Sequence, residues 1–153
     1  YHVEPKICRV EDAVFHPLAT THAVLAVENF KAAFDDYLDV VGLDLVAGGR
    51  EAAFAVFGGT CGTRSLGLFH ANGGRQPGLQ HVGFKIAGEA DLNDSIQRAT
   101  KAGVAIEETF DHPARRGVFI RDIDNIRLQF YLDRTPDPTA LHSADIDTAL
   151  LLA

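Results

Sequence analysis

Two stretches of the chain carry apolar side chains along one face of a helix. In the first stretch the apolar residues recur at helical spacing, and they are Phe30, Phe34, Tyr37, Leu38 and Val41. Asn29 has the side chain of a good N-cap, and Gly42 can take the left-handed conformation that ends a helix. A similar stripe covers residues 91–102, and Gly103 follows it; its inward residues are Leu92, Ile96 and Ala99. The pattern therefore predicts two amphipathic helices.

Short runs typical of β-strands surround each predicted helix. In each half one run precedes the helix and three follow it. In the first half the runs are 22–27 before the helix and 43–46, 52–57 and 65–70 after it. In the second half they are 81–87 before the helix and 104–106, 117–121 and 126–132 after it. The halves repeat at a nearly constant offset, since His22 and His81 are 59 residues apart and Gly42 and Gly103 are 61 apart. We predict an α+β fold of two βαβββ modules, with a mixed, mainly antiparallel curved sheet and the helices outside.

The repeat also divides the chain into segments. The paired modules are expected at 19–133, with the first at 19–71 and the second at 78–133. A linker at 72–77, with two glycines and a proline, joins them. Residues 1–18 form an N-terminal lead-in. Residues 134–153 form a C-terminal tail with two prolines, in which Ser143 can cap a short helix.

Composition and charge exclude several classes of function. The chain has 153 residues, 46% hydrophobic and 23% charged, as expected for one soluble globular domain. A net charge of −7 argues against binding to nucleic acid or to an anionic membrane surface. No run approaches the ~20 apolar residues of a membrane span. Cys8 and Cys61 show neither a disulfide framework nor metal-ligand spacing, and with no leader segment evident the expected location is cytoplasmic.

Alternation along the predicted strands assigns the polar residues to one face of the sheet. The apolar positions that fit against the helices are Ala23, Leu25, Val27, Val82, Phe84, Ile86, Leu128, Phe130 and Leu132. The opposite face then gathers the polar residues His22, His81, Lys85, Arg127, Gln129 and Tyr131. In a curved sheet this face becomes the wall of a cleft. These side chains are therefore candidates for a binding or catalytic site.

Two segments resemble the vicinal oxygen chelate superfamily, which includes glyoxalase I, bleomycin-resistance proteins, fosfomycin-resistance enzymes and extradiol dioxygenases. They are the strand Leu79-Gln80-His81-Val82-Gly83-Phe84 and the ending at residues 122–131. The ending is similar to the family pattern Asp-Pro-Asp-Gly-Asn-Arg-Ile-Glu-Phe-Tyr, with four replacements at Ile123, Asn125, Ile126 and Gln129 besides the conservative Leu128 in place of the Ile. The resemblance covers residues 19–133 and implies the glyoxalase/bleomycin resistance/dioxygenase-like fold.

The resemblance also implies a metal centre. In two-module members, the ligands come from the first strand of each module and the last strand of the second, which gives His22, His81 and Gln129 here. The implied cofactor is a divalent metal (Fe, Mn or Zn), which binds two neighbouring oxygens of a small substrate. Glyoxalase I adds a Glu at the position of Gly67. Because Gln129 offers a neutral amide oxygen in place of a carboxylate, we expect the metal to be weakly bound or absent.

Two further residues are candidates for catalysis. His112 follows Asp111, a pair similar to a dioxygenase motif, and is either a general acid/base or a loop residue before Pro113. Tyr131 either donates a hydrogen bond to the substrate or is an ordinary strand residue.

The sequence is compatible with two functions. One is a metal-dependent enzyme, dioxygenase-like or lyase-like, acting on a small oxygenated molecule. The other is a metal-free small-molecule-binding protein of the bleomycin-resistance type. Exposed strand edges favour a homodimer, and related short members exchange modules between their two chains. The expected partners are thus a small molecule and a second copy, with no nucleic acid and no membrane.

Overall fold

The computed structural model describes residues 13–58, 65–71 and 76–134. Its elements are β1 (Ala19–Val27), α1 (Phe30–Asp39), β2 (Asp44–Gly49), β3 (Phe54–Gly58), β4 (Leu66–His70), β5 (Gly78–Lys85), α2 (Glu89–Ala102), β6 (Glu108–Asp111), β7 (Arg115–Arg121) and β8 (Arg127–Asp133). Both cysteines, residues 1–12 of the expected lead-in, residues 72–75 of the expected linker and the tail from residue 135 lie outside the described residues.

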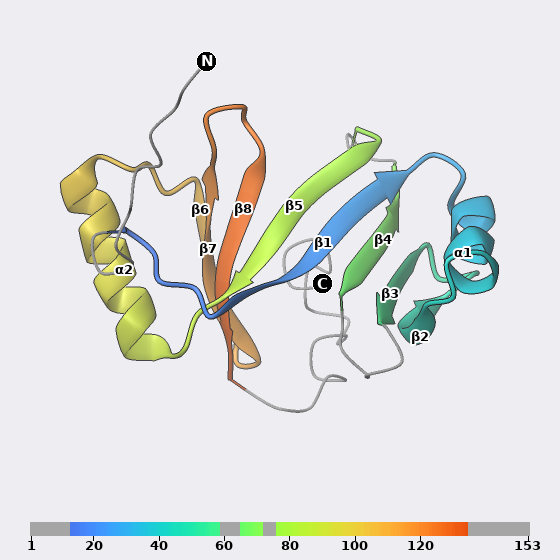
Figure 1. The fold of residues 1–153 in the computed structure, drawn as a ribbon, viewed down its shortest axis with the longest axis horizontal. Helices are drawn as coiled ribbons and strands as arrows, with labels where there is room; N and C mark the ends of the chain where they lie inside the picture. Colours follow the sequence, from blue (N-terminus) through green and yellow to red (C-terminus); the bar gives the residue numbers. More distant parts are fainter. Residues whose placement is uncertain (1–12, 59–64, 72–75, 135–153) are drawn as a thin grey trace, which may run out of the picture.

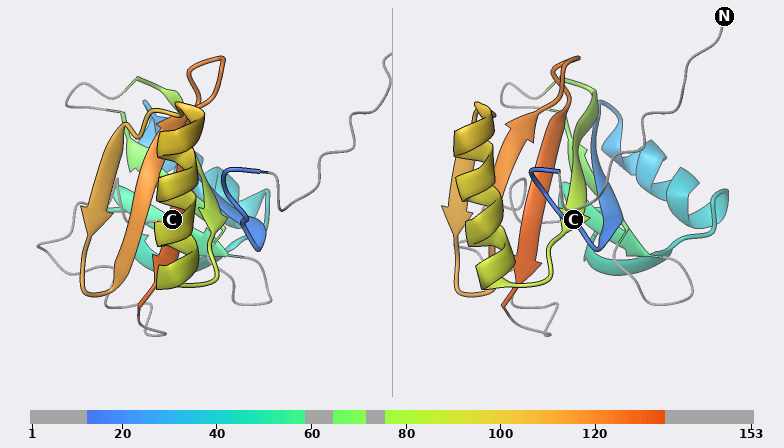
Figure 2. Two further views of the ribbon diagram at one scale, coloured as in Figure 1. Left: turned by 90° about the vertical axis from the view of Figure 1, so that its left-hand side faces the viewer. Right: turned by 60° about the vertical axis from the view of Figure 1, so that its left-hand side comes forward.

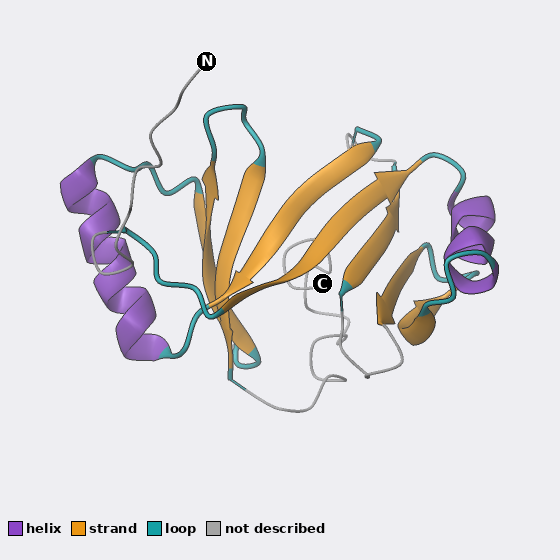
Figure 3. Cartoon of the chain, in the orientation of Figure 1, coloured by secondary structure: helices purple, strands orange, loops and turns teal. Residues whose placement is uncertain are grey.

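The strands form one curved eight-stranded sheet in the order β2-β3-β4-β1-β5-β8-β7-β6 (Figure 1). The pairs β1–β4 and β5–β8 are parallel, and the other neighbours pair antiparallel. The two helices lie outside the sheet at opposite flanks, as Figures 2 and 3 also show. The predicted fold of two βαβββ modules with a mixed, mainly antiparallel sheet is therefore confirmed.

The two modules join through β1 and β5 with a nearly twofold register. Ala23 faces Val82, His22 faces Gly83, and His81 faces Val24. Each strand also contains a register shift typical of a β-bulge, directly before its histidine: Thr21 is the extra residue in β1, and Gln80 is the extra residue in β5. The junction thus brings the equivalent histidines of both modules to the centre of the sheet.

The helix ends follow the capping residues in the sequence. The Asn29 side chain accepts a hydrogen bond from the Ala32 amide (3.3 Å), and Gly42 and Gly103 have φ angles of +81° and +74°. These three assignments are confirmed. The expected apolar stripe of α1 was too long, because the helix ends at Asp39 and leaves Val41 57% exposed.

One predicted strand was wrong. Residues 104–106 are not a strand; the strand that follows α2 is β6, at Glu108–Asp111. After the left-handed turn at Gly103, the Val104 amide donates to the Ala99 carbonyl (2.9 Å), so the chain first turns back against the helix. Val104 and Ile106 then pack into the core below α2 instead of pairing with a strand.

The core confirms most of the predicted facial pattern. Under α2 the sheet contributes Phe84, Ile86, Leu128, Phe130 and Leu132, and under α1 it contributes Leu25 and Val27. A third cluster consists of Val24, Val56 and Phe69 with Ala47 and Phe54. Because Val24 alternates with Leu25, this cluster lies on the face of the first module that points away from α1. Neither described helix has the length and apolar composition needed to cross a membrane.

Candidate metal centre

The three predicted metal ligands lie on three adjacent strands, β1, β5 and β8, at the centre of the sheet (Figure 1). In the register, Gly83 lies opposite His22 on one side and opposite Gln129 on the other. His81 is two residues before Gly83 and therefore shares its face. The side chains of His22, His81 and Gln129 are 4%, 0% and 0% exposed. The structure thus brings the predicted ligands together within one chain.

The two imidazole rings are close enough to share one ion. Their centroids are 5.7 Å apart and their planes meet at 81°. A metal bound at ~2 Å from a ring nitrogen lies about 3 Å from the ring centroid, so two ligating rings can have this separation.

Gly83 makes room for the His22 ring. A Cβ atom on Gly83 would lie 2.1 Å from both Cε1 and Nε2 of His22 and 2.6 Å from Nδ1, so this ring lies directly across β5. Any other residue at this position would occupy the same space. Alternation between His81 and Lys85 puts Gly83 on the polar face, but the sequence interpretation did not recognise this role. The available signal was a glycine inside a strand, which often marks a close approach of another group.

A hydroxyl group holds the other side of the His22 ring. Thr21 Oγ1 lies 3.1 Å from His22 Nδ1, 2.6 Å from the Tyr131 hydroxyl and 3.3 Å from the Gly83 carbonyl oxygen. Strict alternation would direct Thr21 to the face opposite His22. Because Thr21 is the extra residue of the bulge in β1, its side chain lies beside the histidine instead. The sequence interpretation missed Thr21 for this reason.

His81 is a buried neutral imidazole. Both of its ring nitrogens are buried, with no hydrogen-bond partner among the residues that the structure describes. Burial lowers its pKa from 6.5 to about 3, and the positive charges of Arg127 and Arg115 contribute to the shift. An imidazole must be neutral to bind a metal. A buried polar atom without a hydrogen bond is costly, and a metal ion on one ring nitrogen would remove part of that cost.

The donor set fits a divalent metal, with one weakness. Two imidazole nitrogens and one oxygen suit Fe, Mn or Zn, but the amide of Gln129 brings no negative charge. Within the described ranges, no group of three His, Cys, Asp or Glu side chains could hold a metal. A metal centre in this part of the protein would therefore depend on Gln129.

Two arginines lie near the candidate ligands. Arg115 is 3% exposed; its Nε donates to Asp133 (2.8 Å), and its guanidinium carbon lies 4.1 Å from the centroid of the Tyr131 ring. Arg127, which the sequence placed on this face, donates to Glu107 (2.8 Å) and to Glu108, and stacks on Phe119 at 3.7 Å. The sequence interpretation did not find Arg115, because its partner is 18 residues away.

The two residues predicted to be catalytic lie in different settings. Tyr131 is buried beside His22, with ring centroids 5.2 Å apart. His112 lies in the turn between β6 and β7, where its Nδ1 accepts a hydrogen bond from the Ala114 amide (3.0 Å). The structure thus brings Tyr131 to the candidate metal centre and gives His112 a local turn contact. Catalytic roles for both residues stay predictions.

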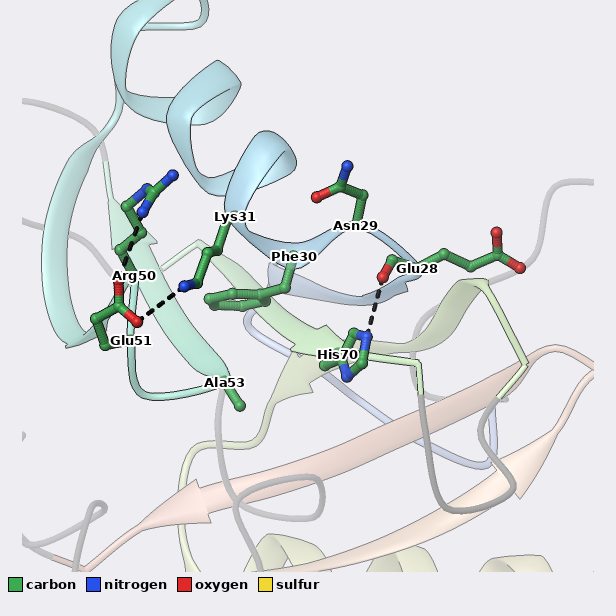
Figure 4. A pocket seen from close by; sticks show the side chains of 8 residues that line it. All are labelled: Glu28, Asn29, Phe30, Lys31, Arg50, Glu51, Ala53 and His70. Atoms are coloured by element: carbon green, nitrogen blue, oxygen red, sulfur yellow. Dashed lines mark hydrogen bonds and ion pairs between the residues drawn. The ribbon is translucent and has the colours of Figure 1, made fainter.

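A cavity of about 540 Å³ lies at the start of α1 (Figure 4), and none of the candidate ligands lines it. Two ion pairs lie in and around it, since Lys31 contacts Glu51 at 3.0 Å and Arg50 contacts Asp35 at 3.1 Å. His70 donates to the Glu28 carbonyl at 2.9 Å. Ion pairs and a backbone contact thus account for Lys31, Glu51, Arg50 and His70.

An open, curved sheet of two βαβββ modules, with a histidine from each module at the junction, defines the glyoxalase/dioxygenase-like class of fold. The sequence model of the Glyoxalase/Bleomycin resistance protein/Dioxygenase superfamily matches residues 19–130, and the chain belongs to this family. Comparison with curated protein sequences finds no match.

Solved structures of this class are similar in fold and distant in sequence. The Mn(II)-bound glyoxalase from Novosphingobium aromaticivorans is 16% identical with a TM-score of 0.62; the match covers 86% of this chain and 42% of that one. A mutant of homoprotocatechuate 2,3-dioxygenase from Brevibacterium fuscum is 17% identical with a TM-score of 0.64. The match covers 78% of this chain and 33% of that one. A catechol 2,3-dioxygenase is 19% identical with a TM-score of 0.57. The match covers 74% of this chain and 40% of that one. The chain therefore spans less than half the length of each.

Proposed function

We propose that this chain is a divalent-metal-dependent enzyme of the vicinal oxygen chelate superfamily, dioxygenase-like or lyase-like, acting on a small oxygenated molecule. The observation that carries the proposal is the convergence of buried His22, His81 and Gln129 on adjacent strands at the module junction. The Mn(II)-bound state of a glyoxalase with the same fold supports a divalent metal.

The three candidate ligands are held in different ways. His22 lies across Gly83 and is held at Nδ1 by Thr21, which leaves Nε2 for the metal. His81 is kept neutral by its burial, and its ring meets the edge of Phe119 with centroids 5.3 Å apart. Gln129 would contribute its buried Oε1 atom. When bound, a divalent metal supplies a Lewis acid that stabilises negative charge on the substrate oxygens.

The amide at Gln129 sets the expected strength of binding. A carboxylate at this position would add one negative charge to the ligand set. At roughly 2 Å from a divalent ion, even a heavily screened charge is worth several kcal/mol. We therefore expect the native protein to hold metal loosely.

The proposal is tested by titrating Fe(II), Mn(II) and Zn(II) into metal-stripped protein. Gln129→Glu should bind metal about tenfold more tightly or better, a gain of ~1.4 kcal/mol for each factor of ten. His81→Ala should abolish binding. Gln80→Glu is the matched control, because Gln80 is on the neighbouring strand and its side chain donates to the Gln76 carbonyl (2.9 Å). It makes the same charge change outside the ligand set. If neither native nor Gln129→Glu protein binds any of the three ions, the metal proposal is wrong.

A second candidate function is metal-free binding of a small molecule, as in bleomycin-resistance proteins. The apolar cluster of Val24, Val56 and Phe69 favours it, because Val24 faces His81 across the junction and shares the face of His22. Equal affinity for a retained small molecule with and without added metal would support this second candidate over the first.

A further inference from the structure

The bulge in β1 places one hydroxyl group between His22 and Tyr131, and its hydrogen bonds can be assigned. We infer that Thr21 is a positioning residue, which holds His22 as the tautomer protonated at Nδ1 and leaves a lone pair on Nε2 at the candidate metal centre. The purpose of this arrangement rests on the proposed metal-binding function. The arrangement itself is a property of the metal-free protein and can be tested without metal.

Counting hydrogens gives the tautomer. A threonine hydroxyl has one hydrogen to donate and two lone pairs to accept with. The Gly83 carbonyl, 3.3 Å from Thr21 Oγ1, can only accept, so it receives that hydrogen. The other two partners must then donate: the Tyr131 hydroxyl at 2.6 Å and Nδ1 of His22 at 3.1 Å. In a neutral imidazole with a hydrogen on Nδ1, Nε2 carries the lone pair that a metal needs.

The hydroxyl is itself held in place from both sides. The bulge fixes the backbone of Thr21 beside His22, and the missing side chain at Gly83 lets the His22 ring lie flat across β5. On the other side, Arg115 stacks on the Tyr131 ring at 4.1 Å and donates to Asp133 at 2.8 Å. A chain of contacts thus runs from Asp133 through Arg115, Tyr131 and Thr21 to His22.

The equivalent position in the second module lacks this arrangement. Gln80 is the extra residue before His81, but its side chain donates to the Gln76 carbonyl. Nδ1 of His81 has no hydrogen-bond partner within the described residues. The two histidines are therefore equivalent in the repeat but different in how they are held. Metal-ligating histidines commonly have a hydrogen-bond acceptor on their second nitrogen, and Thr21 supplies that acceptor for His22 alone.

The direct test is the protonation pattern of the imidazole nitrogens in metal-stripped protein, measured by long-range ¹H–¹⁵N NMR in mildly alkaline solution. The His22 signals are assigned by their absence from a His22→Gln variant. Native protein should show His22 with the hydrogen on Nδ1. Thr21→Val, which keeps the shape and removes the hydroxyl, should shift His22 toward the Nε2-protonated tautomer, and Thr21→Ser should restore the native pattern. A native spectrum with the hydrogen on Nε2, or an unchanged pattern in Thr21→Val, would overturn the inference.

A metal titration separates this inference from the proposed function. Thr21→Val should weaken metal binding about 10- to 100-fold, whereas Thr21→Ser should bind almost as the native protein does. Equal affinity in native and Thr21→Val protein would count against a positioning role. If the native protein binds no metal, the proposed function fails, while the NMR pattern still decides what Thr21 does. The native spectrum requires no variant, so the test stands even if Thr21→Val folds poorly.

Discussion

Replacing Gly83 by alanine should displace the His22 ring from the candidate metal centre. The new Cβ atom would lie 2.1 Å from two ring atoms, where ordinary contacts are 3.4–4 Å, so the ring would have to move by roughly 1.3 Å. Overpacking of this kind costs ~1–3 kcal/mol. Against this, a glycine-to-alanine change stabilises by about 0.4–1 kcal/mol through the unfolded chain. We expect a net loss of about 1–2 kcal/mol in the free energy of unfolding.

The assays are urea unfolding and metal titration of the metal-stripped protein. Besides the loss of stability, Gly83→Ala should lower metal affinity at least tenfold, or about 1.4 kcal/mol, because His22 no longer points at the site. The matched control is Gly49→Ala in β2, where a Cβ atom would meet nothing within 4 Å. That variant should stay within about 0.5 kcal/mol of native stability. Native stability and native metal affinity in Gly83→Ala would refute the placement of the His22 ring across β5.

Three other predictions concern acid stability, a buried ion pair and assembly. Because the pKa of His81 falls to about 3 on folding, the unfolded chain takes up a proton below pH 6.5 that the folded chain does not. Metal-stripped protein should therefore lose up to ~1.4 kcal/mol per pH unit as the pH falls from 6.5 toward 3, and urea unfolding of His81→Phe should show a smaller slope. Asp133→Asn removes a charged partner of buried Arg115 and should cost about 1–3 kcal/mol in the same assay; native stability would contradict this. We also propose a homodimer, because the strand β2 at the end of the sheet exposes Leu45 and Val46; sedimentation of a stable monomer at micromolar concentration would rule it out.

The helices and most strands could be predicted from the sequence because they depend on the conformational preferences of residues close together in the chain. The stripe beginning at Phe30, the cap at Asn29 and the left-handed glycines at Gly42 and Gly103 each act within one or two turns of chain. The same locality explains the wrong strand at residues 104–106. Their β-like composition serves equally well for a segment packed against a helix, and only the tertiary contacts of Val104 and Ile106 decide between the two.

The candidate site was predicted from the alternation of side chains between the two faces of each strand. The prediction missed residues at positions where this alternation is broken. Alternation and the repeat placed His22, His81 and Gln129 on one face, and the structure has them together on adjacent strands. A bulge shifts the alternation by one residue, so alternation could not find Thr21 beside His22. Arg115 depends on pairing with distant Asp133, and no local pattern reports such a contact.

The nearly twofold register gives the second-module residues of the candidate centre counterparts in the first module. Val24 corresponds to Gly83, Gly67 to Gln129, and Phe69 to Tyr131. If an ancestral module was duplicated, the two copies have since diverged: the second has Gln129 and Tyr131 where the first has Gly67 and the apolar Phe69. Selection can then change Val24 and Phe69 to suit a new substrate while the three ligands, His22 from β1 and His81 and Gln129 from β5 and β8, stay constant. We expect natural variation in specificity to accumulate around Val24 and Phe69, and loss of metal binding to arise from changes at the ligands and at Thr21.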